Sequence, residues 1–150
     1  FLLQNNKDNI NKKFKISSST HYDEEHNDIY SISYDEKNRW FASQHKENSY
    51  LCFDFMDNRI IPIEYEIRSY PIKKYSPKSW VIEGSIDNSN WELLDYEIDC
   101  PILNKVSFRH VFKIKNVKGN KFKFIRMRLI GKNWGESTSL EFNSFEIFNY

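Results

Sequence analysis

Aromatic and basic side chains occur together in three polar segments of the sequence, between stretches of alternating hydrophobicity. Aromatic rings offer flat apolar faces with a polar edge, and lysine or arginine adds a cation. This combination suits sugar rings, peptides or anionic groups. Binding residues concentrate on loops that a rigid scaffold presents. The candidate ligand-binding residues are Arg39, Trp40, Tyr70, Lys73, Lys74, Tyr75, Lys132 and Trp134.

Two of these aromatic residues leave a second interpretation open. A large ring in a polar loop is costly unless it packs or binds. Trp40 and Trp134 can each pack as a plug that closes its own loop. The segment 70–75 has the stronger claim to binding, because two tyrosines and two lysines stand close together between expected strands.

The acidic stretch near the start of the chain does not indicate catalysis. Asp23, Glu24 and Glu25 are adjacent, whereas a catalytic carboxylate pair must face across a cleft of roughly 5–10 Å. The sequence also has no glycine-rich phosphate loop, nucleophile elbow or zinc-protease motif, so no enzyme is expected. No cofactor is expected, although a cation bound by His21, Asp23 and His26 stays an open alternative.

Strands are expected to present any binding loops. Period-two alternation is clear over 51–55, 106–114 and 125–129, and turn residues separate the runs. Near the end of the chain, Leu140 and Phe142 form one apolar run, and Phe145 and Ile147 form the next. The two runs share one face of the sheet only if a bulge falls near 143–144. Gly84 is expected to permit a turn that a Cβ would hinder. Many short strands at regular spacing predict an all-β sandwich or barrel.

Composition excludes several partners. The net charge is +1, so no global field attracts nucleic acid. Residues 101–150 hold ten Lys and Arg against three Glu, a local balance of +7, but strand spacing interleaves them with apolar residues. We therefore expect these cations on a sheet face. No apolar run approaches the ~20 residues of a membrane span. Cys52 is expected to be a small buried core residue.

Four stretches resemble the discoidin domain, also called the coagulation factor 5/8 type C domain. They are residues 48–55, 77–95, 124–129 and 145–148. The resemblance implies a galactose-binding-like jelly-roll β-sandwich, in agreement with the alternation. It covers about 30–150, with a plausible first strand near 14–20.

The resemblance also sets the expected domain limits and ligand-binding end. We expect a discoidin-like domain over 14–150, with a linker or N-terminal extension over 1–13. Family ligands come to loops at one end of the barrel. By position, those loops here are 20–30, 34–47, 69–78 and 131–138. Their tips are acidic, polar or lysine-bearing, so membrane insertion is not expected.

Departures from the family pattern point to an intracellular setting. Secreted members often join the ends of the domain by a disulfide, but Cys52 and Cys100 both lie mid-chain. The stretches 65–71 and 131–134 are similar to discoidin-like domains attached to intracellular BTB-type adaptor proteins. This likeness implies a cytoplasmic location and further domains in a longer parent protein.

The main functional prediction is a non-catalytic module that recognises a protein or peptide within an adaptor. Carbohydrate binding is the first alternative, and a purely structural domain is the second. A sugar site requires an exposed flat ring beside polar groups in a shallow pocket, whereas peptide recognition requires a broader groove or patch.

Overall fold

The alternating runs form antiparallel strands in a computed structural model that describes residues 14–31, 39–69, 74–117 and 119–149. The expected linker over 1–13 lies outside these residues. The strands are β1 Lys15–Ser18, β2 Phe41–Ala42, β3 Tyr50–Asp54, β4 Pro62–Arg68, β5 Trp80–Ser85, β6 Glu92–Glu97, β7 Arg109–Lys113, β8 Phe124–Leu129, β9 Glu141–Phe142 and β10 Ser144–Asn149. Two short 3-10 turns, η1 Glu24–His26 and η2 Asp28–Ser31, follow β1.

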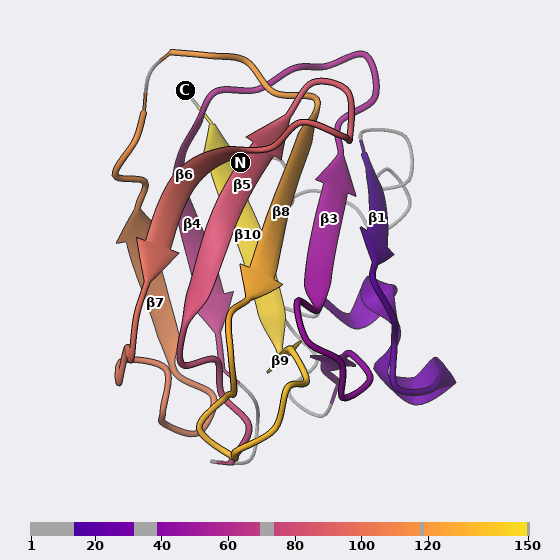
Figure 1. Cartoon of the computed structure of the whole chain (residues 1–150), viewed down its shortest axis with the longest axis vertical. Helices are drawn as coiled ribbons and strands as arrows, with labels where there is room; N and C mark the ends of the chain where they lie inside the picture. The colour runs from indigo at the N-terminus through magenta and orange to yellow at the C-terminus, as the bar shows by residue number, and fades with distance from the viewer. Residues whose placement is uncertain (1–13, 32–38, 70–73, 118, 150) are drawn as a thin grey trace.

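Two sheets face each other across the core (Figure 1). The five-stranded sheet has the order β1-β3-β8-β5-β6, and the three-stranded sheet has the order β10-β4-β7. Strands β2 and β9 form a short third pair at the lower end of Figure 1. All the pairings are antiparallel. The all-β sandwich expected from the alternation is confirmed.

Aromatic rings fill the space between the sheets, which explains how a chain that is only 39% hydrophobic builds a core. Phe53 of β3 stacks against Phe145 of β10 with ring centroids 5.5 Å apart. Tyr65 of β4 stacks on Phe112 of β7 at 5.2 Å. Cys52 is buried, as expected. Each of these rings removes roughly 150–250 Å² from water, so the low hydrophobic fraction suffices.

Two local expectations are wrong. The strand expected over 106–114 is shorter, because β7 begins at Arg109 and Val106 is 56% exposed. Gly84 does not form a turn: it lies within β5, where an added Cβ would sit 2.7 Å from the Phe122 ring. The left-handed conformation in the following hairpin falls on Asn88 instead. Asn143 separates β9 from β10 near the position of the expected bulge, but the register shift of β10 lies between Phe148 and Asn149.

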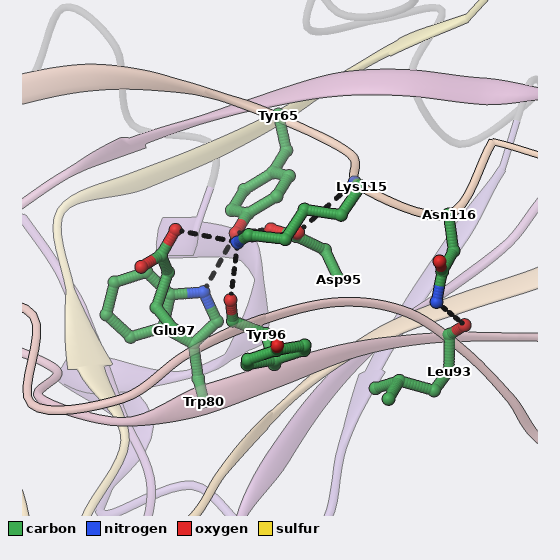
Figure 2. A network of polar contacts seen from close by, with 8 residues as sticks. All are labelled: Tyr65, Trp80, Leu93, Asp95, Tyr96, Glu97, Lys115 and Asn116. Atoms are coloured by element: carbon green, nitrogen blue, oxygen red, sulfur yellow. Dashed lines mark hydrogen bonds and ion pairs between the residues drawn. The ribbon is translucent and has the colours of Figure 1, made fainter.

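A buried polar network joins the two sheets (Figure 2). The Tyr65 hydroxyl donates to Oδ2 of Asp95 at 2.6 Å and accepts the indole N–H of Trp80 at 3.1 Å. The Lys115 ammonium lies 3.1 Å from Oδ1 of Asp95. Asp95 is fully buried, so these partners compensate the cost of removing its charge from water.

The expectation for the basic side chains of the last third is met only in part, because strands carry Arg109, Lys113, Arg126 and Arg128 while the other described lysines lie in loops. Arg126 and Arg128 of β8 both pair with Glu83 of β5, at 3.0 and 2.9 Å. The Arg126 guanidinium also stacks 3.8 Å from the centre of the Trp91 ring. These cations therefore belong to the outer face of the larger sheet. The described residues include no helix long and apolar enough for a membrane crossing.

Candidate functional site

A pocket of about 300 Å³ opens at the end of the sandwich where β2 and β9 lie. Side chains from four separate segments line it, namely the turn η1 with its approach, the β2 region, the loop before β5, and the approach to β9. The lining residues are Tyr22, His26, Trp40, Ala42, Ser43, His45, Tyr75, Ser139 and Glu141. A volume of this size falls at the small end of ligand-binding cavities.

Aromatic and imidazole rings form one wall of the pocket. The rings of His26 and Trp40 lie 4.5 Å apart between centroids. Tyr22 places its ring edge-on to both His26 and His45, at 6.0 and 6.3 Å. Tyr22 is 57% exposed, so a large part of its ring is available to a ligand.

Local hydrogen bonds position this wall. Asp23 caps η1, because its Oδ1 accepts a hydrogen bond from the Glu25 backbone N–H at 3.0 Å. The same oxygen is hydrogen-bonded to Nδ1 of His26 at 2.5 Å. The hydrogen bond with His26 is the main cause of the lowered pKa of Asp23. The Tyr22 backbone N–H donates to the Ala42 carbonyl at 2.7 Å, which ties this segment to β2. The acidic loop expected from the sequence is therefore attached to the barrel.

A buried carboxyl group contributes a second part of the pocket lining. Glu141 of β9 is only 9% exposed, and the Ser139 hydroxyl donates to its Oε2 at 2.6 Å. Burial raises the pKa of the Glu141 carboxyl to about 7, against the smaller opposing effects of Ser139 and His26. Within the described part of the chain, Glu141 pairs with no lysine or arginine.

A chain of hydroxyl groups connects Glu141 to the rim. The Ser137 hydroxyl lies 3.2 Å from the Ser139 hydroxyl and 2.7 Å from Nδ1 of His45. The Asn133 side chain holds this loop, since its Oδ1 accepts the backbone N–H of Ser137 at 3.1 Å. The polar lining is thus fixed before any ligand arrives, which lowers the entropic cost of binding.

Tyr75 can line the pocket because Gly135, in the loop that it packs against, has no side chain. A Cβ on Gly135 would lie 2.4 Å from Cδ1 of Tyr75 and 2.6 Å from the carbonyl oxygen of Lys74. Only glycine permits this close approach. The Lys74 ammonium lies 5.1 Å from the centre of the Tyr75 ring.

The structure brings together some of the candidate residues from the sequence and separates others. Trp40 and Tyr75 line the pocket, and Lys74 lies against Tyr75. Arg39 precedes Trp40 and has an exposed side chain, while its carbonyl accepts a hydrogen bond from Asn143.

The segment 131–134 does not contribute to the lining. Lys132 is exposed and does not line the pocket. The Trp134 indole N–H donates to the Cys100 carbonyl at 3.1 Å, and its ring lies under Lys78, so Trp134 packs as a loop-closing plug. Tyr70 and Lys73 lie outside the described residues.

Sequence reasoning missed Tyr22, His45, Ser139 and Glu141 as pocket residues. Tyr22 and His45 lie in the loops 20–30 and 34–47, which the resemblance places at the ligand-binding end, but neither residue is among the candidates chosen by type and spacing. Glu141 precedes Phe142 as an outward residue of an alternating strand would. Only the pairing of β2 with β9 reveals that this position faces a pocket. The described residues contain no group of three or more His, Cys, Asp or Glu suited to a metal ion.

Comparison with known proteins identifies the fold. No protein-family model matches the chain, and no curated protein matches it. Solved structures do match. CpGH89CBM32-5 from Clostridium perfringens, in complex with GalNAc-β-1,3-galactose, has a TM-score of 0.69 at 10% identity, covering 91% of this chain and 96% of that one.

Two further structures give the same result. The CBM32 of AlyQ, in complex with 4,5-unsaturated mannuronic acid, has a TM-score of 0.70 at 12% identity, over 91% of this chain and 95% of its own. The family 32 CBM of NanJ from C. perfringens, in complex with galactose, has a TM-score of 0.65 at 9% identity. The match covers 91% of this chain and 93% of that one. The chain therefore has the galactose-binding-like β-sandwich fold that the sequence resemblance implied.

Proposed function

We propose that this chain is a non-catalytic carbohydrate-binding module whose sugar occupies the pocket lined by Trp40, Tyr22 and Glu141. The observation that carries the proposal is the meeting of flat rings with fixed polar groups in one small pocket. Sugars present apolar C–H faces to aromatic rings and hydroxyls to hydrogen-bonding groups. The pocket offers both within about 300 Å³, at the small end of the range for ligand-binding cavities.

The polar groups are matched to hydroxyl recognition. Glu141 can accept hydrogen bonds, and the imidazoles of His26 and His45 can donate or accept according to tautomer. Because Glu141 is buried, a hydrogen bond that it makes to a ligand is stronger than one made in water. Specificity would then reside in Glu141 and affinity in the rings.

The predicted protein or peptide recognition receives less support than carbohydrate binding. A peptide site would be a broad groove or patch, whereas the described loops enclose a small pocket. The compared solved structures with bound ligands hold sugars, which adds to the case for a sugar here. The association with a BTB-type adaptor and the cytoplasmic location stay predictions.

Titration calorimetry against a panel of mono- and disaccharides tests this function. At least one sugar should bind the unaltered chain, and Trp40→Ala should weaken that binding at least tenfold, because the ring supplies stacking area. Tyr96→Ala is the matched control, since Tyr96 is an exposed aromatic residue of β6 outside the pocket lining. Equal losses in both variants, or no binding by any sugar, would refute the proposal.

A further inference from the structure

The charge of the pocket carries an inference about the kind of sugar, and this inference depends on the proposed function. Glu141 is a nine-tenths buried carboxyl group that lines the pocket. Its Oε2 accepts a hydrogen bond from Ser139, and no described residue donates to its Oε1. A buried carboxylate that no lysine or arginine pairs with is unfavourable, so a ligand that brings a permanent cation would gain a strong interaction.

The rings beside Glu141 suit a cation as well. An ammonium group is attracted to the faces of tryptophan and tyrosine within about 6 Å of the ring centre. Trp40, Tyr22 and Tyr75 all line the same pocket as Glu141. A carboxylate together with aromatic rings is a combination that recognises an amine, whereas a uronic acid would place a second carboxylate near the first.

The rim adds negative charge of its own. Asp23, Glu24 and Glu25 stand on the turn that supplies His26 to the pocket. Asp23 is engaged by His26 and Glu24 by His21, and Lys74, which lies against Tyr75, carries an opposing charge. The three carboxylates of this turn favour the approach of a cation, although Lys74 and the exposed Arg39 oppose it, because exposed charges act over about 8–10 Å at physiological salt.

We propose that the pocket selects sugars that carry a free, protonated amine, and that this amine forms an ion pair with Glu141. The aromatic wall would cover the apolar face of the same sugar ring. Glu141 is then the specificity-determining residue. An N-acetylated sugar has the same ring but no charge, so it would lose the ion pair while retaining the stacking contacts.

Titration calorimetry with four probes tests this inference. The probes are glucosamine and galactosamine, each compared with its N-acetylated counterpart at neutral pH. At least one amine should bind about tenfold more tightly than its counterpart. Glu141→Gln should remove this preference and retain binding of the N-acetylated sugar. Glu136→Gln, an exposed change in the loop before β9, should leave the preference intact.

Salt provides a second measurement on the unaltered chain, independent of any variant. Raising the salt concentration should weaken binding of the amine more than binding of its N-acetylated counterpart. Neutral or N-acetylated sugars that bind as tightly as amines would overturn this inference and leave carbohydrate binding standing. A preference that survives in Glu141→Gln would also overturn it. Absence of binding by every sugar would refute the proposed function and this inference together.

Discussion

The Ser139 hydroxyl donates a 2.6 Å hydrogen bond to the carboxyl group of Glu141, a residue only 9% exposed at the start of β9. This bond partly compensates the burial of the carboxyl group. Burial nevertheless raises the pKa of Glu141 to about 7. Glu141 thus reduces the stability of the folded protein when it ionises, and this cost is expected at a site that awaits a ligand.

Replacing Glu141 by Gln should therefore change how stability depends on pH. The folded state holds the Glu141 proton more tightly than the unfolded state. The protonated Glu141 carboxyl group makes its full contribution to the stability of the folded state below about pH 4.5. This contribution is lost as the pH rises to about 7. The free energy of unfolding of Glu141→Gln should equal that of the unaltered chain near pH 4. At pH 8 it should be higher than that of the unaltered chain by roughly 2–3 kcal/mol. Urea unfolding at both pH values measures this difference, and equal stabilities at pH 8 would contradict it.

Tyr22 separates stacking from hydrogen bonding in the pocket. Its ring is more than half exposed and stands edge-on to His26 and His45. Tyr22→Ala should weaken sugar binding by roughly 1–2 kcal/mol through loss of ring area. Tyr22→Phe retains the ring and should bind within about twofold of the unaltered chain. Calorimetric titration distinguishes them, and an equal loss in Tyr22→Phe would assign the contribution to the hydroxyl.

Two glycine substitutions should have opposite consequences. A Cβ on Gly135 meets the Tyr75 ring at 2.4 Å, so Gly135→Ala should displace this ring and weaken sugar binding at least several-fold. A Cβ on Gly84 meets the Phe122 ring at 2.7 Å inside the sandwich. Gly84→Ala should cost roughly 1–3 kcal/mol of stability and leave the affinity of the folded fraction unchanged. Thermal unfolding and sugar titration of both variants check this contrast, which a loss of affinity in Gly84→Ala would contradict.

The network between the sheets should be a major determinant of stability. Tyr65→Phe removes the donor to buried Asp95 and the acceptor for the Trp80 indole N–H. Each buried group left without a partner costs roughly 1–3 kcal/mol, so the variant should lose at least about 2 kcal/mol. Tyr96→Phe is the matched control, because Tyr96 is about half exposed and its ring would retain its contact with Lys115 (Figure 2). Similar urea midpoints for the two variants would contradict this account.

The sheets could be predicted from the sequence because side-chain alternation is a local property. Residues 51–55 and 125–129 alternate as β3 and β8 do, and their pairing follows from burial of one face. Val106 shows the limit: it continues the alternation but lies in a turn before β7, where Ser107 has a positive φ. Alternation cannot report where pairing stops.

The candidate site was only partly predictable, because its parts come from distant segments. Trp40 and Tyr75 were found as aromatic residues in polar loops. Glu141 was missed because its burial depends on the short pair of β2 with β9, more than ninety residues apart in sequence. Trp134 has the same local pattern as Trp40, yet it bonds to the Cys100 carbonyl and packs under Lys78. Which tryptophan faces a ligand depends on loop geometry that no local pattern records.

The most direct test of carbohydrate binding at this pocket is a map of backbone amide shifts during titration with the tightest-binding sugar of the panel. We expect the largest shifts to cluster at residues 20–26, 40–45 and 135–141, which surround the pocket. The hairpin 85–92 borders a separate pocket of about 250 Å³ that includes Trp91. Largest shifts at that hairpin, or no shifts at all, would contradict sugar binding at the pocket lined by Trp40, Tyr22 and Glu141.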